Sequence, residues 1–223
     1  MKQLREKPTR AGAKTAKNKG SSVFAPRELD GFTQFGVDVS TISDVHRSLL
    51  AQWRNSMNLV GPGPLDPHFD DCERATHWLR PEGHWVDLGS GAGFPGLVMA
   101  DRFPELRLDL VDSRKKRCVF LEQVLGQAGV PATRVQVHCV RVETLTGPYD
   151  GVVSRAFAPP PQVLDHAQRL LRPGGTLVLF LQDPAEVPED PRFESFHVER
   201  YRVDGKARQA VGLRLRPEAT PAG

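Results

Sequence analysis

Apolar residues along the first third of the chain follow a helical period. One stretch carries them at intervals of three or four positions: Ile42, Val45, Leu49, Trp53 and Met57. This spacing predicts an amphipathic helix over 43–58 with Ser43 as its N-cap, and we expect its apolar face to pack into the core. Gly61-Pro62-Gly63-Pro64 ends it, and a second helical pattern follows over 68–79.

From residue 84 onward, short apolar runs alternate with helical patterns. The runs that read as strands are 84–88, 106–111, 135–140, 151–154 and 176–181. The helical patterns between them are 94–103, 114–128 and 162–171, the last closed by Pro173-Gly174-Gly175. This alternation predicts a parallel sheet with right-handed connections, which binds its ligand at the carboxyl ends of the strands.

The end of the chain is different, because two extended stretches follow each other without a helix. They cover 193–203 and 207–216 and meet at Asp204-Gly205, a hairpin turn signal. The predicted fold class is therefore α/β and Rossmann-like, with a mostly parallel seven-stranded sheet, a C-terminal antiparallel hairpin and an N-terminal helical extension. We expect a tail over 1–22, the extension over 23–82, the main domain over 83–216 and a frayed end over 217–223.

Composition narrows the class of protein. The chain has 223 residues, 39% of them hydrophobic, and a formal net charge of +3. That suits one α/β domain with additions, and the sequence holds neither a membrane-spanning apolar stretch nor a secretory signal. Cys72, Cys118 and Cys139 form no CxxC pattern, so we expect no disulfide framework, no metal site and a cytoplasmic location. The basic tail is either a solvated segment or an arm that contacts nucleic-acid phosphates.

A glycine-rich stretch after the first strand is the candidate ligand site. Gly91-x-Gly93-x-x-Gly96 satisfies the dinucleotide pattern, with Asp112 as a candidate ribose partner. That reading predicts an NAD-dependent oxidoreductase, although no candidate hydride-transfer site accompanies it. Another interpretation is a tight strand-to-helix turn that binds no ligand.

A second reading of the same stretch starts one glycine earlier, as Asp87-x-Gly89-x-Gly91-x-Gly93. An acid in front of the loop suits a positively charged ligand and repels a pyrophosphate. This arrangement favours S-adenosylmethionine, whose sulfonium and amino-acid tail replace the pyrophosphate of a dinucleotide.

Several blocks in this order resemble one family. They are MNLV at 57–60, VDLGSGAGFPG at 86–96, LVDSRKKR at 110–117 followed by Phe120-Leu121, RVE at 141–143 and YDGVVSRAF at 149–157. Over about 39–216 the chain resembles the bacterial GidB (RsmG) family of small-subunit ribosomal RNA guanine-N7 methyltransferases. The resemblance implies methyl transfer from S-adenosylmethionine to N7 of a guanine in that RNA, by a cytoplasmic monomer that acts on the RNA or the ribosomal subunit.

The resemblance also implies roles for individual residues. The donor-binding residues implied by it are Asp87, Gly89, Gly91, Gly93, Phe94, Asp112, Ser113, Val142, Glu143 and Arg155. Asp112 is expected to bind the ribose hydroxyls, with Val142 and Glu143 beside the adenine. Residues expected to support activity through donor or RNA contacts are Arg155, Lys116, Arg117 and Arg141. The structural alternative for Arg155 is an ion pair with Asp112 or Asp150.

Two positions depart from the family pattern. Pro67 precedes His68 where the family usually has Arg-His, and Gln182-Asp183 stands where it often has Lys-Gly. These departures leave two alternatives open: a non-catalytic RNA-binding or ribosome-assembly protein with the same fold, or a methyltransferase with another RNA target.

The chemistry of guanine N7 requires little of the protein. Its lone pair is free in the neutral base, so no proton is removed before attack and no general base is expected. Neither an NPPY-like block for an exocyclic amine nor a Pro-Cys nucleophile is found in the sequence. Catalysis is then expected to rest on alignment of donor and acceptor and on exclusion of water.

Overall fold

The computed structural model of the chain describes residues 41–219. Its helices are α1 (Ile42–Met57), α2 (Asp66–Thr76), α3 (Gly96–Arg102), α4 (Lys115–Gln127) and α5 (Pro160–Leu170), with short 3-10 turns η1 (Val142–Thr144) and η2 (Pro217–Ala219). Its strands are β1 (His84–Leu88), β2 (Arg107–Val111), β3 (Val135–His138), β4 (Tyr149–Arg155), β5 (Leu171–Gln182), β6 (Phe193–Val203) and β7 (Lys206–Leu215). The expected basic tail over 1–22 lies outside the described residues.

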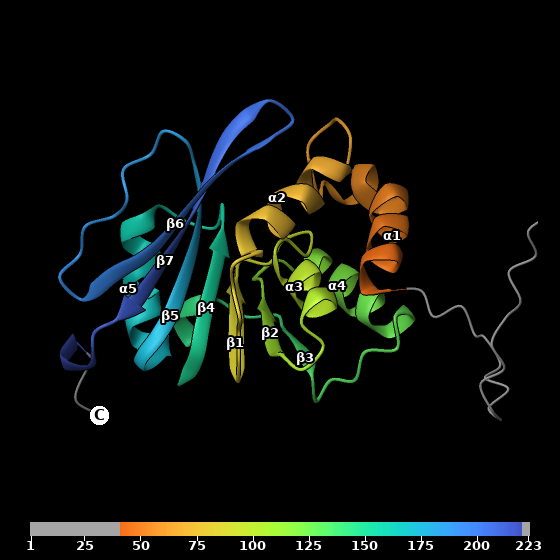
Figure 1. Ribbon diagram of the computed structural model, residues 1–223. Coiled ribbons are helices and arrows are strands. Elements are labelled where there is room, and N and C mark those ends of the chain that lie inside the picture. The colour runs from red at the N-terminus through yellow and green to blue at the C-terminus, as the bar shows by residue number, and fades with distance from the viewer. Residues whose placement is uncertain (1–40, 220–223) are drawn as a thin grey trace, which may run out of the picture. The chain divides into compact units, whose positions relative to one another are not determined.

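All seven strands form one sheet in the order β3-β2-β1-β4-β5-β7-β6 (Figure 1). The five strands from β3 to β5 are parallel, whereas β7 runs antiparallel between β5 and β6. The turn between β6 and β7 has positive φ at Asp204 (48°) and Gly205 (71°), as a two-residue hairpin turn requires. The predicted fold class is confirmed.

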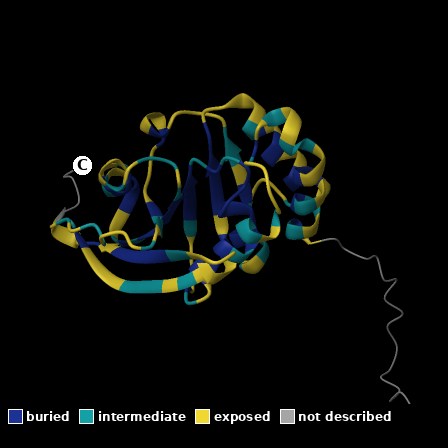
Figure 2. Cartoon of the chain, turned by 90° about the horizontal axis from the view of Figure 1, so that it is seen from above, coloured by how far each residue is buried: buried dark blue, intermediate teal, exposed yellow. Residues whose placement is uncertain are grey.

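A hydrophobic core fills each face of the sheet. On one face Leu108, Leu110 and Val153 join side chains from α1 to α4. On the other face Val152, Leu177 and Val211 pack with α5. Figure 2 shows the consequence, since the central strands are buried and exposure is concentrated on the outer helices and loops. Among the described helices, none is both long and apolar enough to cross a membrane.

Helix α1 begins with a different cap from the predicted one. Thr41, and not Ser43, is the N-cap: its side-chain oxygen accepts the backbone N–H of Asp44, whose carboxylate accepts the N–H of Thr41 in return. Such a reciprocal capping box satisfies two backbone donors that the helix itself leaves unpaired. Helix α2 begins at Asp66, two residues before the predicted start.

Strand β5 starts earlier than predicted, because Leu171 already pairs with Tyr149 in the parallel ladder. Pro173-Gly174-Gly175 therefore lies within this strand and not in a loop after α5. The expected frayed end is also partly ordered, since Pro217–Ala219 forms η2. The boundary at residue 83 between the helical extension and the main domain stays a prediction.

Leu110 links the sheet to the start of α3. It is fully buried, and a Cβ placed on Gly96 would lie 2.3 Å from its Cδ2 atom. We expect Leu110→Ala to lower the free energy of unfolding by about 2–5 kcal/mol, because the lost contacts leave a cavity that the sheet cannot close. Urea denaturation measures this change.

The matched control is Val119→Ala on α4, where the side chain is 38% exposed. We expect it to change the free energy of unfolding by less than about 0.5 kcal/mol. Equal destabilisation by the two substitutions would contradict this description of the core.

Candidate functional site

The glycine-rich loop between β1 and α3 is held by two buried carboxylates. Asp112 accepts the backbone N–H of Gly91 at 3.0 Å, and Asp87 accepts that of Gly96 at 3.1 Å. Gly91 has a φ of 57°, a conformation that L side chains rarely adopt. Both loop N–H groups are thus used within the protein, and the loop has a fixed shape.

Ser90 ties the same loop to the end of β2. Its N–H donates to the carbonyl of Val111 at 2.9 Å, and its hydroxyl accepts the N–H of Val111 at 3.0 Å. These bonds place the loop next to Asp112, which follows β2 directly. The ends of β1 and β2 therefore form one rigid unit.

Helix α1 supports the loop from the other side through His46. The Nε2 atom of this fully buried residue lies 2.6 Å from the carbonyl oxygen of Ala92, and its ring lies among those of Phe69, Phe94 and Phe120. Burial lowers the pKa of His46 to about 4, so the ring is neutral and Nε2–H donates to the carbonyl. Its Nδ1 atom has no hydrogen-bond partner in the part of the chain described.

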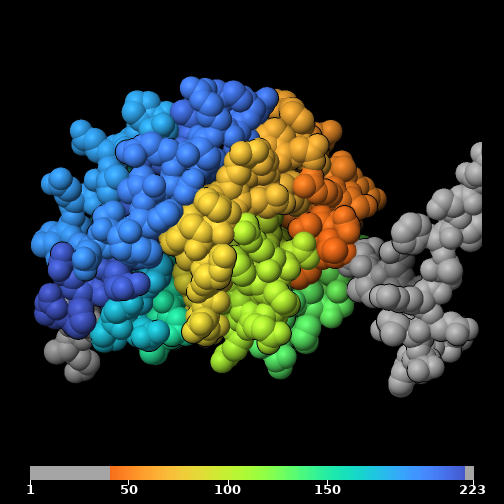
Figure 3. Space-filling view, viewed as in Figure 1, coloured from red at the N-terminus to blue at the C-terminus, as the bar shows by residue number. Residues whose placement is uncertain are grey.

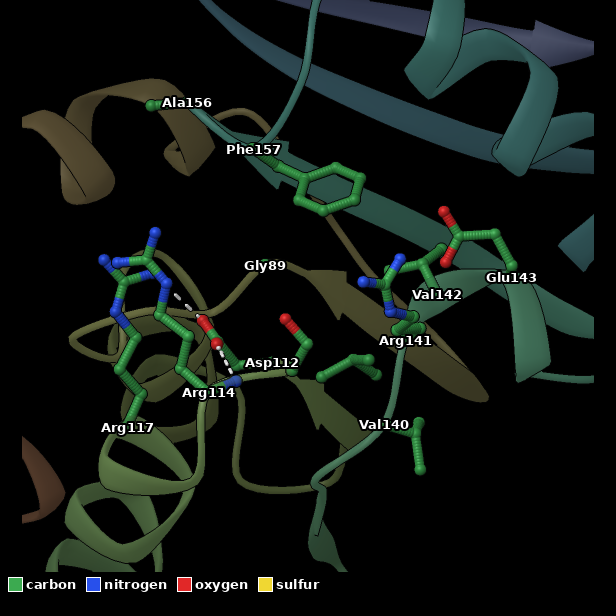
Figure 4. A pocket seen from close by; sticks show the side chains of 12 residues that line it. Gly89, Asp112, Arg114, Arg117, Val140, Arg141, Val142, Glu143, Ala156 and Phe157 are labelled. Atoms are coloured by element: carbon green, nitrogen blue, oxygen red, sulfur yellow. Dashed lines mark hydrogen bonds and ion pairs between the residues drawn. The ribbon is translucent and has the colours of Figure 1, made fainter.

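A cavity of about 410 Å³ opens beside this loop, at the carboxyl ends of β1, β2 and β4 (Figure 4). Its walls include Gly89, Asp112, Arg117, Val142, Glu143 and Phe157. The volume is within the usual range for small-molecule sites, about 300–1,000 Å³. The cavity therefore lies where a sheet of this topology binds its ligand.

Asp112 is the central polar group of this cavity, although its side chain is only 5% exposed. Besides Gly91, its carboxylate accepts the N–H of Arg114 at 2.8 Å and the Nη1–H of Arg117 at 3.2 Å. Figure 4 shows the Arg117 guanidinium lying over the carboxylate at the edge of the cavity. The Asp112 carboxylate is thus oriented by hydrogen bonds from the glycine loop and from the start of α4.

Phe157 forms the opposite wall. It follows β4 after Ala156, whose φ of 53° turns the chain back toward the glycine loop. A Cβ on Gly89 would lie 2.5 Å from Cδ2 of Phe157, so only glycine permits this contact. The SRAF block contains Phe157, but the sequence does not indicate that this side chain forms a wall of the cavity, because its position depends on the turn at Ala156.

The cavity brings together most of the residues that the sequence indicated. Those that line it are Gly89, Asp112, Ser113, Arg117, Arg141, Val142 and Glu143. Those that shape the loop without lining the cavity are Asp87, Gly91, Gly93 and Phe94. Arg114, Val140 and Ala156 also line it and were assigned no role, although Arg114 and Ala156 lie within quoted blocks, because the fold decides which loop residues face the cavity.

Lys116 and Arg155 lie elsewhere. Lys116 is exposed on α4 and is not among the residues of the cavity wall. Arg155 points into a second cleft, where its Nε–H donates to Asp71 of α2 at 2.8 Å and its Nη2–H donates to Nδ1 of His68 at 3.2 Å. The suggested ion pairs of Arg155 with Asp112 or Asp150 are wrong: Asp71 is its partner, and Asp150 pairs with Arg172.

The Arg155–Asp71 pair belongs to a network that crosses three elements. Tyr201 of β6 donates its hydroxyl to the second oxygen of Asp71 at 2.9 Å. His68 stacks on Phe94 of the glycine loop with ring centroids 5.3 Å apart, and burial together with the Arg155 charge lowers its pKa. The network therefore joins α2, the end of β4 and the C-terminal hairpin. Figure 3 shows α2 lying against the hairpin.

Within residues 41–219, no group of three or more His, Cys, Asp or Glu side chains is arranged to hold a metal ion. The three cysteines, all in this part of the chain, are free thiols.

Comparisons with known proteins match this chain to one family. The family model for GidB, described as rRNA small subunit methyltransferase G, matches residues 44–209. Proteins named ribosomal RNA small subunit methyltransferase G from Methylobacterium radiotolerans and Rhodospirillum centenum are similar to this chain, with 38% identity over 143 residues and 40% over 159. The alignments cover 60% and 67% of this chain, and it spans 66% and 71% of those relatives' lengths.

A solved structure supports the fold. The O-methyltransferase from Bacillus cereus, in complex with S-adenosylhomocysteine, has a TM-score of 0.54 to this chain and 14% identity. The match covers 77% of this chain and 90% of the other. Identity this low shows the fold alone.

Asp87 makes the stability depend on pH. Burial raises its pKa to about 7 from an ordinary value of 3.8, so between these values the folded protein binds a proton that the unfolded chain lacks. Asp87 therefore makes the free energy of unfolding fall as pH rises from about 4 to about 7. We expect Asp87→Asn to remove this fall, since asparagine stays neutral and still accepts the Gly96 N–H.

Urea unfolding of both proteins at about pH 4.5 and about pH 7 measures this effect. The stability of the variant relative to the wild type should increase with pH by up to ~1.4 kcal/mol per unit. His46 contributes with the opposite sign, because its lowered pKa destabilises the folded state as pH falls, but it is present in both proteins and cancels in the difference. A difference that is independent of pH would contradict the burial of a protonated Asp87.

Proposed function

The chain belongs to the GidB family, rRNA small subunit methyltransferase G, and on this premise we propose that it transfers a methyl group from S-adenosylmethionine to N7 of a guanine in small-subunit ribosomal RNA. The observation that carries the proposal is the position of Asp112. Its carboxylate is fixed beside a glycine loop and lines a cavity of about 410 Å³ at the carboxyl ends of β1 and β2.

The residues of the cavity fit the methyl donor. Asp112 presents a carboxylate that accepts hydrogen bonds from ribose hydroxyls, and Val142 and Phe157 offer apolar surfaces to an adenine ring. Glu143 adds a second carboxylate to the cavity wall. When bound, the donor supplies an electrophilic methyl group on a sulfonium.

The same loop is unsuited to a dinucleotide. A dinucleotide site uses free backbone N–H groups at the loop and helix start to bind the pyrophosphate. Here the N–H groups of Gly91 and Gly96 already donate to Asp112 and Asp87. A pyrophosphate would have to displace these bonds and would face the Asp112 carboxylate in the cavity wall.

The protein's task in this reaction is to align the reactants. Guanine N7 attacks with its own lone pair, so no side chain has to accept a proton. The fixed loop and the wall of Phe157 orient the donor, and the enclosure excludes water. We assign Arg117 and Arg141 to contacts with donor or RNA because they line the cavity, and Lys116 to RNA because it is exposed beside them.

The proposal also covers the setting of the reaction. We propose that the chain acts as a cytoplasmic monomer on the RNA or the assembling subunit. Its three unpaired thiols support a reducing compartment.

The proposed activity is tested with small ribosomal subunits from cells that lack the family enzyme. The purified protein and labelled S-adenosylmethionine should yield labelled 7-methylguanosine, identified by nucleoside analysis. Label in another nucleoside would mean a different RNA target. Donor binding without transfer to any RNA would favour the non-catalytic RNA-binding alternative.

A substitution at Asp112 tests the donor site itself. We expect Asp112→Asn to weaken binding of S-adenosylhomocysteine at least about tenfold, because hydrogen bonds to a charged acceptor contribute about 1.5–3 kcal/mol and 1.4 kcal/mol is a factor of about ten. Titration calorimetry measures the affinity, and thermal unfolding shows whether the variant is folded.

The matched control is Glu105→Gln, which removes an exposed carboxylate from the loop before β2. Its affinity for S-adenosylhomocysteine should equal that of the wild type. A folded Asp112→Asn protein that binds as tightly as the wild type would exclude Asp112 as the ribose partner.

A further inference from the structure

A second cleft, of about 200 Å³, lies beyond the end of β4 from the donor cavity. One wall is the loop Gly61-Pro62-Gly63-Pro64 between α1 and α2, and another is the tip of the β6–β7 hairpin with Lys206 and Arg208. Arg155 lines it between them. Figure 1 shows the tip of this hairpin approaching the loop between α1 and α2.

The two cavities are separated by consecutive residues. Arg155, the last residue of β4, lines the second cleft, whereas Ala156 and Phe157 line the donor cavity. Reacting atoms must approach within about 3–3.5 Å for methyl transfer. An acceptor held in the second cleft is therefore adjacent to a donor held in the first.

The second cleft carries positive charge that the protein does not neutralise. Asp71 is balanced by Arg155 and accepts a further hydrogen bond from Tyr201. In the stretch 41–219, Lys206 and Arg208 form neither an ion pair nor a side-chain hydrogen bond, and Arg155 donates nothing from Nη1. Asp204 is the other acid in the wall, so an excess of cations faces the cleft.

The wall opposite these cations is rigid. Arg54 of α1 donates hydrogen bonds to the carbonyl oxygens of both Gly61 and Gly63, and the one to Gly63 measures 2.6 Å. These bonds fix the carbonyl groups of the loop that forms this wall.

We propose that this cleft binds a backbone phosphodiester of the RNA beside the target nucleotide, through Lys206 and Arg208. The inference rests on the proposed function and adds to it the residues that anchor the acceptor. Antiparallel pairing places Arg208 of β7 opposite Gln182 of β5. The hairpin therefore supplies a cation beside the end of β5, whose own residue there is uncharged. His68 and the Arg155 guanidinium, whose Nη2–H donates to Nδ1 of His68, line the same cleft beside the anchored phosphate.

The test compares the double variant Lys206→Ala/Arg208→Ala with the control Arg107→Ala/Arg214→Ala. Both control residues are exposed and lie toward the opposite edge of the sheet from the cleft: Arg107 begins β2, and Arg214 of β7 pairs with Thr176 of β5. Each double variant removes two positive charges, so a difference between them reports position and not net charge.

Binding to small ribosomal subunits is measured as a function of salt. Loss of the contact to this phosphate should make the slope of log affinity against log salt shallower by about 0.7–0.9, the contribution of one neutralised phosphate. The KM for the subunits should rise at least about tenfold, with the affinity for S-adenosylhomocysteine unchanged. The control should keep the wild-type slope and KM.

Three outcomes separate the possibilities. A wild-type slope and KM in the Lys206→Ala/Arg208→Ala protein, with methyl transfer intact, overturn the cleft assignment and leave the proposed function standing. A wild-type protein that transfers no methyl overturns the proposed function, and the salt slope then still tests the RNA contact. Binding of inorganic phosphate alone that is lost in the double variant, without any change in RNA affinity, identifies a free-anion site and also overturns the assignment.

Discussion

Two buried carboxylates fix the glycine loop, and the rest of the site depends on them. Asp87 and Asp112 stand at the ends of adjacent parallel strands and each accepts a backbone N–H of the loop. Because these acceptors are inside the protein, the loop keeps its shape without a phosphate. The N–H groups of Gly91 and Gly96 are therefore not free to bind a pyrophosphate.

The end of β4 then divides the site into two parts. The positive φ at Ala156 sends Phe157 toward the donor, while Arg155 remains on the other side with Asp71 and Tyr201. The tip of the C-terminal hairpin lies on this second side, beside Arg155 in the wall of the cleft. The end of β4 thus contributes to both cavities, because Phe157 lines the first and Arg155 lines the second cleft.

The sequence predicted the parts of this structure that depend on local patterns. Alternating apolar runs indicated the sheet, and glycines with Asp112 indicated the donor cavity, because short motifs carry their own backbone constraints. The partner of Arg155 was missed, since Asp71 lies 84 residues away and on a helix whose charges look solvated. Lys206 and Arg208 were missed for the same reason: only the antiparallel pairing of β7 brings them to the site.

On the proposed function, the donor occupies the cavity at Asp112 with its reactive end toward the cleft beyond Ala156. A crystal structure with bound S-adenosylhomocysteine tests this placement. We expect ribose hydroxyls on the Asp112 carboxylate, adenine beside Val142 and the sulfur atom toward the end of β4. A ligand bound elsewhere, or one whose sulfur faces away from Arg155 and the hairpin tip, would contradict it.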